Sequence, residues 1–270
     1  MNGAPLMKRD RLSAIRQILY SSGSSSIEEI AEAVGASPAT VRRDLVTLES
    51  TGAVTRTRGG ARIADSAGIE VAFQHREQQN LAAKRAIAEA AFEKLAPHCS
   101  LFLDAGTTVL QLARCIRLNP MPLSVFTNCL VTAQHLMDVA GIKVTVIGGV
   151  LRSENASMVG SLAEELLERL WFDHLFLGAG AIADDLCIYS LDEAEARLNE
   201  KMLARATLKT LLVDHSKFDR RLTYRVAALA PEIEIITDDG LDAFWRRRLV
   251  DLGCEPRIVS VSNGAGEGIE

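Results

Sequence analysis

The stretch SPATVRRDLVTLESTGAVTRTRGGA, residues 37–61, decides the fold of the N-terminal part of the chain. Val41, Leu45 and Leu48 recur at helical spacing, which places them on one buried face of a helix. Ser37 is predicted to cap this helix and Pro38 to open its first turn. The residues that follow alternate and then break at a glycine pair, which predicts a two-stranded hairpin.

Two shorter helical segments precede this stretch. Apolar residues at helical spacing predict a helix over residues 8–20, and SIEEIAEAV, residues 26–34, predicts a second helix capped by Ser26. Gly35 permits a tight turn before the third helix. Together with the hairpin as a wing, these segments indicate a winged helix-turn-helix domain over residues 7–63.

The outward face of the third helix suits double-stranded DNA. Arg43 is expected to read a base, because a guanidinium can donate two hydrogen bonds to guanine, and Arg42 is expected to bind phosphate. Val46 either touches a thymine methyl group or is a stray apolar surface residue. The predicted DNA-binding residues are Ser37, Ala39, Thr40, Arg42, Arg43, Arg56 and Arg58.

The charge of the chain is divided between its two parts. The whole chain carries a formal net charge of −5, yet residues 1–64 hold nine Lys and Arg against six Asp and Glu. A local basic surface, rather than the average over the chain, determines contact with DNA. The overall acidity therefore belongs to the remaining residues and does not exclude a DNA-binding function.

Residues 37–61 resemble the DNA-binding signature of DeoR-type bacterial transcriptional regulators. The matching positions are Ser37, Thr40, Val41, Arg42, Arg43, Asp44, Leu45, Leu48, Glu49, Gly52, Arg56, Gly59, Gly60 and Ala61. Thr57 and Arg58 stand where Val-His is frequent in that family, which adds a positive charge to the wing.

The second part of the chain repeats one theme, in which an apolar strand-like run ends in a small or polar turn and a helix follows. The runs are LFLDAGTT, LSVFTN, KVTVIGG, HLFLGAGA, TLLVDHSK, IEIITDD and RIVSV, after a long helix predicted over FQHREQQNLAAKRAIAEAAFEKL, residues 73–95. This alternation predicts an α/β domain over residues 73–261, with a mostly parallel sheet between two helical layers. Residues 64–72 are expected to be a linker and residues 262–270 a disordered tail.

Polar motifs follow several of these strands, where ligands of parallel sheets bind. DAGTT, residues 104–108, leads into a helix N-terminus and predicts a phosphate seat. The domain resembles the DeoR-type effector domain, itself similar to ribose-5-phosphate isomerase, which implies a phosphorylated sugar or polyol near Thr107, Thr108 and Lys217. The candidate effector-binding residues are Asp104, Gly106, Thr107, Thr108, Thr127, Asn128, Gly148, Gly149, Arg152, Gly178, Glu193 and Lys217.

Two functions compete for this domain: a sugar-phosphate sensor and an isomerase tethered to DNA. An aldose–ketose isomerase needs carboxylates to move a proton, and the matching isomerase strand ends in Asp-Gly-Ala-Asp. Here the same slot reads LGAG, residues 177–180, which favours a sensor without catalytic residues. Glu193 or Glu195 still occupies the region of the isomerase base, and Asp184 and Asp185 are displaced along the chain. GAIADDLCIYS, residues 180–190, departs from the family pattern, so the effector is expected to be atypical or the site degenerate.

The remaining features set the cellular context. Five cysteines are widely spaced without a C-x-x-C pair, which indicates a reducing cytoplasm and neither disulfides nor a metal site; no cofactor is expected. No apolar run is long enough for a membrane span, and Met1 or Met7 is the start of the protein. We expect a homo-oligomer, dimeric or tetrameric, that represses or activates a sugar operon, with repression the usual sign in the family.

Overall fold

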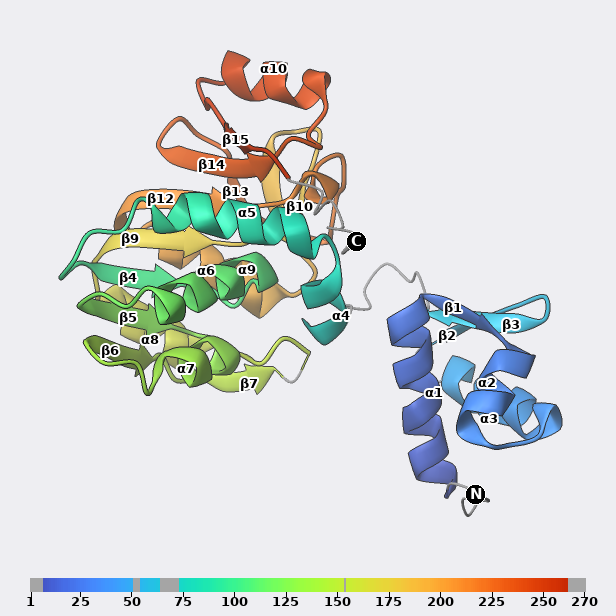
Figure 1. Ribbon diagram of the computed structural model, residues 1–270. Coiled ribbons are helices and arrows are strands. Elements are labelled where there is room, and N and C mark those ends of the chain that lie inside the picture. The colour runs from blue at the N-terminus through green and yellow to red at the C-terminus, as the bar shows by residue number, and fades with distance from the viewer. Residues whose placement is uncertain (1–6, 51–53, 64–72, 153, 262–270) are drawn as a thin grey trace, which may run out of the picture. The chain divides into compact units, whose positions relative to one another are not determined.

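The computed structural model describes residues 7–50, 54–63, 73–152 and 154–261 (Figure 1). The chain divides into two compact units, one ending at His75 and the other beginning at Arg76. The predicted linker at residues 64–72 and the predicted disordered tail at residues 262–270 lie outside the described residues.

The N-terminal unit contains the three predicted helices and the predicted wing. The helices are α1 (Lys8–Ser22), α2 (Ile27–Val34) and α3 (Pro38–Ser50), and the wing strands are β2 (Val54–Thr57) and β3 (Gly60–Ile63). Ser26 and Glu29 form a capping box at the start of α2, and Gly35 ends that helix in the left-handed conformation. Val41, Leu45 and Leu48 are buried as predicted.

The wing carries a third strand that the sequence did not predict. SSGSSS reads as a turn, but β1 (Ser24–Ser26) pairs antiparallel with β3. Gly60 permits this pairing, because a Cβ atom there would lie 2.3 Å from the Ser25 carbonyl oxygen. A side chain at Gly60 would therefore force β1 away from the wing.

The C-terminal unit is built on a seven-stranded sheet in the order β15-β14-β12-β9-β4-β5-β6. Every neighbouring pair is parallel, so the mostly parallel sheet is confirmed. The strands are β4 (Ser100–Leu103), β5 (Leu123–Thr127), β6 (Ile142–Val146), β9 (Phe172–Leu177), β12 (Ala206–Leu212), β14 (Ile233–Asp238) and β15 (Arg257–Val259). Each of the seven apolar runs in the sequence forms one of them.

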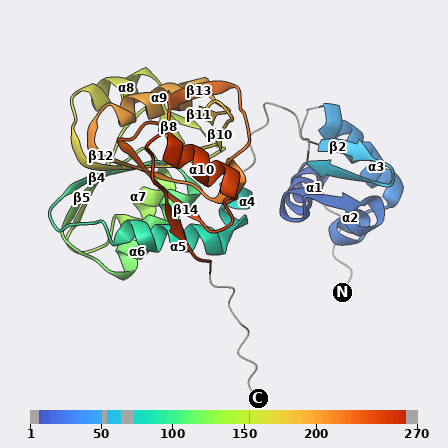
Figure 2. The ribbon, with the colours of Figure 1, turned by 90° about the horizontal axis from the view of Figure 1, so that it is seen from above.

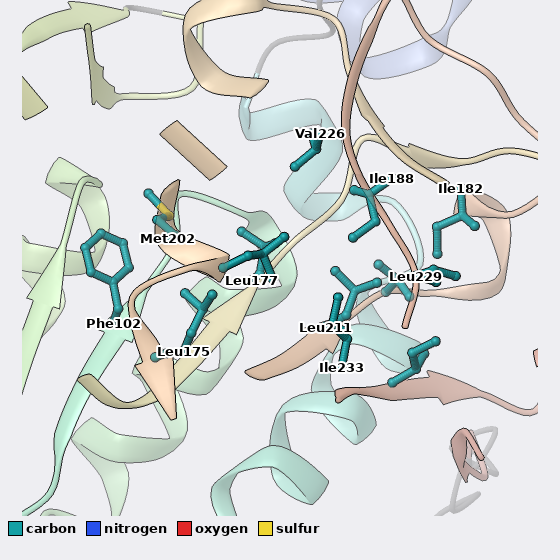
Figure 3. Close-up of a cluster of buried hydrophobic side chains, with 14 of the residues drawn as sticks. Phe102, Leu175, Leu177, Ile182, Ile188, Met202, Leu211, Val226, Leu229 and Ile233 are labelled. Carbon is teal, nitrogen blue, oxygen red and sulfur yellow. The ribbon is translucent and has the colours of Figure 1, made fainter. Parts of the chain in front are cut away.

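Helices cover both faces of the sheet (Figure 2). One face packs against α5 (Leu81–Phe92), α6 (Thr107–Leu118) and α7 (Leu130–Leu136), and the other against α8 (Ser161–Glu168), α9 (Glu193–Leu203) and α10 (Ala243–Asp251). Alternate residues of each strand supply the two cores: Leu175 and Leu177 lie in one, and Phe176 in the other. Figure 3 shows the first core, with Leu175, Leu177 and Met202 together.

Two smaller antiparallel pieces flank the main sheet and were not predicted. A hairpin consists of β7 (Val150–Arg152) and β8 (Ser157–Val159). A three-stranded sheet contains β10 (Ala181–Ile182), β11 (Cys187–Ser190) and β13 (Tyr224–Ala228).

The long helix predicted over residues 73–95 is wrong. It is broken into α4 (Phe73–Gln78) and α5, which starts at Leu81. Asn80 between them is left-handed, with φ of +51°, and the side-chain amide of Asn80 donates to Asp214 at 2.8 Å. A long-range hydrogen bond thus overrides the helical propensity of the segment, and apolar periodicity alone does not reveal it.

Candidate functional sites

The outer face of α3 presents the residues predicted to contact DNA. Arg42, Arg43 and Ala39 are exposed, and Val46 is 48% exposed. The Ser37 hydroxyl caps α3 by accepting from the Thr40 amide at 3.2 Å, and the two hydroxyl groups lie 2.9 Å apart. The structure therefore brings the predicted helix residues together at the N-terminal end and outer face of one helix.

The orientation of α3 depends on an ion pair that the sequence reasoning missed. Arg11 of α1 donates to the Asp44 carboxylate at 2.6 Å, and Asp44 is only 2% exposed. The sequence did contain a signal for this ion pair. Asp44 directly follows two outward-facing arginines and falls on the buried side of the helix, where a carboxylate needs a partner.

A groove of about 470 Å³ lies between α3 and the wing. Its lining includes Arg42 from the helix and Arg56 and Arg58 from the wing. Arg58 is exposed beside the tip residue Gly59, whereas Arg56 donates to the Glu49 carboxylate at 2.7 Å. Three of the four predicted cationic residues therefore line one open groove, but Arg56 is already paired with a carboxylate there.

The candidate effector site lies where the direction of strand addition reverses. Strand β4 sits between β5 and β9, and the sheet grows from β4 toward β6 before the chain returns to β9. Ligands of open parallel sheets bind outside the carboxyl ends of the strands at such a switch point. Here Asp104 follows β4 and Gly178 follows β9, and the Gly178 amide donates to the Asp104 carboxylate at 3.1 Å. We call this region the carboxyl-end site.

Asp104 is held in an environment that disfavours its charge. Burial raises its pKa to about 6, while the Gly178 and Ala105 amides and the Arg76 guanidinium oppose the rise. Gly106 and Gly178 lie so close that a Cβ atom on either would be 3.3 Å from the Cα atom of the other. The next residues begin α6, whose N-cap is Gly106 and whose Thr107 and Thr108 are buried.

Positive charges gather at the same end of the sheet. Lys84 of α5 is only 2% exposed, and burial lowers its pKa to about 8, although the nearby Asp214 carboxylate opposes this shift. Lys217, in the short helix η1 (His215–Lys217), also has its pKa lowered by burial. The charges of Lys217 and Arg76 both lower the pKa of Lys84, so these three cations lie near enough to repel one another. The sequence reasoning assigned Lys217 but not Lys84.

Comparison with known proteins accounts for both units. A model of the DeoR-like helix-turn-helix domain matches residues 11–67, and a model of the DeoR C-terminal sensor domain matches residues 79–239. The chain belongs to the DeoR family.

This DeoR-family chain has curated relatives that match along nearly its full length. The HTH-type transcriptional regulator GlpR of Haloferax volcanii is 36% identical over 248 residues, which cover 92% of this chain and 96% of that protein. A putative aga operon transcriptional repressor of Escherichia coli O157:H7 is 34% identical, covering 93% of each. Among solved structures, ribose 5-phosphate isomerase A from Methanocaldococcus jannaschii has a TM-score of 0.39 and 17% identity, over 53% of this chain and 57% of that one.

Several predicted effector residues of the DeoR-family chain are committed to holding the fold. The Thr127 hydroxyl donates to the Leu103 carbonyl at 2.6 Å and accepts from the Cys129 amide. Gly149 has φ of +145°, and a Cβ atom there would lie 2.5 Å from the Val159 carbonyl oxygen, so this glycine lets β8 approach. Gly148 has open space in place of a side chain.

Asn128 differs from these residues. It is fully buried at the end of β5, and its Oδ1 atom has no hydrogen-bond partner within the described parts of the chain. A buried acceptor without a donor is costly, so Asn128 retains a role as a candidate ligand for a hydroxyl group.

The predicted Arg152 and Glu193 occupy different surroundings. Arg152 donates to Glu195 at 2.6 Å and lies 3.5 Å from Asp192, so two carboxylates offset its charge. The Glu193 side chain is 61% exposed and faces Arg197 at 3.3 Å. Of the two glutamates considered for the isomerase base, Glu195 is therefore the more enclosed one, and it is held by Arg152.

The displaced carboxylates Asp184 and Asp185 are engaged by other side chains. Asp184 and Asp185 form the turn between β10 and β11, where Arg221 lies 2.6 Å and 3.1 Å from them. Asp185 also accepts from the Tyr189 hydroxyl at 2.6 Å.

Within the described residues, no helix is long and apolar enough to cross a membrane.

Proposed function

We propose that this DeoR-family chain represses a sugar or polyol catabolic operon and is released from its operator by a phosphorylated sugar or polyol. Arg43 reads a base, Arg42 and Arg58 bind phosphates of the duplex, and Ser37, Ala39 and Thr40 lie along the groove edge. Arg56 contributes in part, because it shares its charge with Glu49. The chain acts as a homo-oligomer, since linked DNA-binding units raise the affinity for paired half-sites.

The cations at the carboxyl-end site carry the effector assignment. Lys84 and Lys217 are held in surroundings that disfavour their charge, and the raised pKa of Asp104, about 6, makes that carboxyl group easier to protonate than an ordinary aspartate. Buried cations are stabilised by an anion that enters among them, and a phosphate group offers up to two negative charges. Thr107, Thr108 and the amides at the start of α6 add donors to the same anion.

The sugar end of the effector lies toward Asn128 and Gly178. The unpartnered Asn128 Oδ1 atom suits a sugar hydroxyl, and the absence of side chains at Gly106 and Gly178 lets the effector approach the backbone. Glu195 and Arg152 remain paired with each other and line the far side. The chain is not an isomerase in this proposal, because the LGAG slot lacks the two carboxylates of the isomerase strand, and Glu195 and Asp184 are held in ion pairs.

The test uses purified full-length protein and an operator selected from random duplexes. Fluorescence anisotropy measures operator binding while pentose, hexose and polyol phosphates are added one at a time. At least one phosphorylated compound is expected to release the DNA, and its unphosphorylated form is not. No release by any of them would refute the effector assignment, and interconversion of aldose and ketose phosphates would refute the non-catalytic function.

Matched lysine variants test the site itself. Lys217→Ala is expected to bind the operator normally but to need a higher concentration of the releasing compound. Lys143→Ala, on the exposed edge of β6, removes the same charge away from the site and should respond like the wild type. An unchanged response in Lys217→Ala would remove Lys217 from the effector site.

A further inference from the structure

The joint between α4 and α5 is built against the local preferences of its residues. Asn80 is the N-cap of α5, yet it is left-handed and its side chain makes no capping hydrogen bond. Its amide instead donates to Asp214 at 2.8 Å, a residue 134 positions later in the chain. Asp214 also accepts from the Ser216 amide at 3.1 Å and belongs to the carboxyl-end site. The joint is therefore fixed by the site and not by its own helix.

Lys84 provides a second connection between the joint and the site. Its ammonium group donates to the backbone carbonyl of Arg76, in the last turn of α4. The last carbonyls of a helix have no partner within the helix, and a lysine is one of the groups that can cap them. The same ammonium group is one of the cations assigned to the effector, so it has two competing acceptors.

A third connection runs through α6. Glu77 of α4 accepts from Arg114 of α6 at 2.5 Å, and the N-terminus of α6 is the DAGTT turn at residues 104–108. The three connections thus join α4 and the joint after it to Asp214, to Lys84 and to α6, the helix whose N-terminus is part of the carboxyl-end site. Helix α4 crosses the boundary between the two units at His75, and Figure 1 shows it directly before α5.

We propose that α4 is the element that transmits effector binding, because a bound anion draws the Lys84 ammonium group away from the Arg76 carbonyl and leaves the C-terminus of α4 uncapped. This inference rests on the function proposed above and adds its mechanism. The carbonyl is neutral and the anion is charged, so the anion is the stronger acceptor for an ammonium donor. Helix α4 has only six residues, and such a short helix depends on its caps and neighbours.

The change reaches the DNA-binding unit through the chain itself. Helix α4 begins at Phe73, and residues 64–72 connect it to the wing strand β3. Loosening of α4 lengthens the reach of the chain between β3 and α5, because a helix spans less length per residue than an extended chain does. A longer and less ordered connection lowers the effective concentration of one DNA-binding unit for its half-site when the other is bound. Release then requires no change within the winged helix-turn-helix itself.

Hydrogen exchange in the full-length protein tests this proposal with inorganic phosphate as the probe. Peptides covering residues 73–79 are followed by mass spectrometry with and without phosphate, and calorimetry on the same samples measures phosphate binding. Exchange in α4 is expected to rise about fivefold on binding, the change that corresponds to losing one hydrogen bond of about 1 kcal/mol. Peptides from α10 serve as the internal reference and should not change.

Two variants separate the coupling from the binding. Asn80→Gly keeps the left-handed backbone but removes the side-chain amide that reaches Asp214. This variant should still bind phosphate, and the backbone amides of its α4 should exchange fast even before phosphate is added. His98→Gly is the matched control, because His98 is also left-handed, with φ of +67°, and lies in a different loop. Lys84→Met keeps a long side chain in the buried position without the cap, so its α4 should exchange fast at all phosphate concentrations.

The possible results distinguish the two proposals. Phosphate binding with unchanged or slower exchange in α4 would overturn the coupling and leave the effector site standing. Absence of phosphate binding at tens of millimolar would overturn both. Slow, wild-type-like exchange in Asn80→Gly and Lys84→Met would also overturn the coupling, even if the wild type responded. A rise confined to α4, lost in both variants and kept in His98→Gly, supports it.

Discussion

Protonation of Asp104 should control how strongly the carboxyl-end site binds an anion. Its pKa of about 6 in the free protein means that the carboxyl group is roughly nine-tenths ionised at pH 7 and roughly one-tenth ionised at pH 5. The ionised form places a negative charge near Arg76 and the entering anion. Anion binding is therefore favoured by the protonated form, and by linkage a bound anion raises the pKa of Asp104 further.

The size of the effect follows from these fractions. If the anion binds only the protonated form, the affinity gains at most about tenfold between pH 7 and pH 5, or about 1.4 kcal/mol. Sulfate is the suitable probe, because it remains a dianion over this range whereas a phosphate ester changes its own charge. Lys84, with a pKa of about 8, stays protonated at both pH values and adds little to the slope.

Calorimetric titration of sulfate into wild-type protein and Asp104→Asn measures this slope. The asparagine oxygen can still accept from the Gly178 amide, so the shape of the site is retained. The variant is expected to bind sulfate at pH 7 about as tightly as the wild type does at pH 5, with a flat profile between them. His215, whose ring nitrogen is hydrogen-bonded to the carboxylate of Asp238 at the end of β14, is the same in both proteins, so a difference between their profiles belongs to residue 104. An equal slope in wild type and variant would refute the role given to Asp104.

Three further predictions concern DNA binding, the wing and the switch point. Arg43→Ala should cost about 1–3 kcal/mol of operator binding and relax base specificity. Arg42→Ala should instead weaken binding to all duplexes and lower the slope of log affinity against log salt concentration by about 1. Equal effects of the two variants in anisotropy titrations would contradict the assignment of Arg43 to a base and Arg42 to a phosphate. Gly60→Ala should destabilise the N-terminal unit by about 3 kcal/mol in denaturation, because its Cβ atom overlaps the β1 backbone. Gly59→Ala is the control, because its Cβ atom would meet open space and only the positive φ of +91° is unfavourable; it should cost about 1 kcal/mol of stability. A larger loss of stability in Gly59→Ala than in Gly60→Ala would count against the predicted overlap at Gly60. Gly178→Ala should lower sulfate affinity by calorimetry at a stability cost of about 1 kcal/mol, since its Cβ atom would lie 3.4 Å from the Asp104 carboxylate; unchanged affinity would place the anion elsewhere.

The main architecture was predictable because the type and position of most strands and helices are determined by residues that are neighbours in the sequence. The seven parallel strands have apolar runs bounded by turn residues, and α3 has buried apolar residues at the helical spacing of Val41, Leu45 and Leu48. The helix caps at Ser26 and Ser37 were equally predictable, since a capping residue acts within its own turn. In each case the residues that determine the element are its own or its immediate neighbours.

The features that escaped prediction depend on distant partners. The break at Asn80 is set by Asp214, the burial of Asp44 by Arg11, and strand β1 by the missing side chain of Gly60. The two nearby glutamates stayed alternatives in the sequence for the same reason: Arg152, from another element, determines that Glu195 is more enclosed than Glu193. Sequence spacing cannot supply such pairings, because the partners come from other elements.

The departures from local rules gather at the carboxyl-end site, and this concentration has an energetic consequence. A left-handed Asn80, an almost fully buried Lys84 and a carboxyl group with a raised pKa each cost stability in the free protein. A ligand can shift a conformational equilibrium only by its difference in affinity between the two states. An anion bound next to Lys84 offsets part of the free energy that burial of the ammonium group costs. This gain exists only in the arrangement where the ammonium group faces the anion and no longer donates to the Arg76 carbonyl. In the proposed mechanism, these costs are the source of the free energy that effector binding transfers to α4.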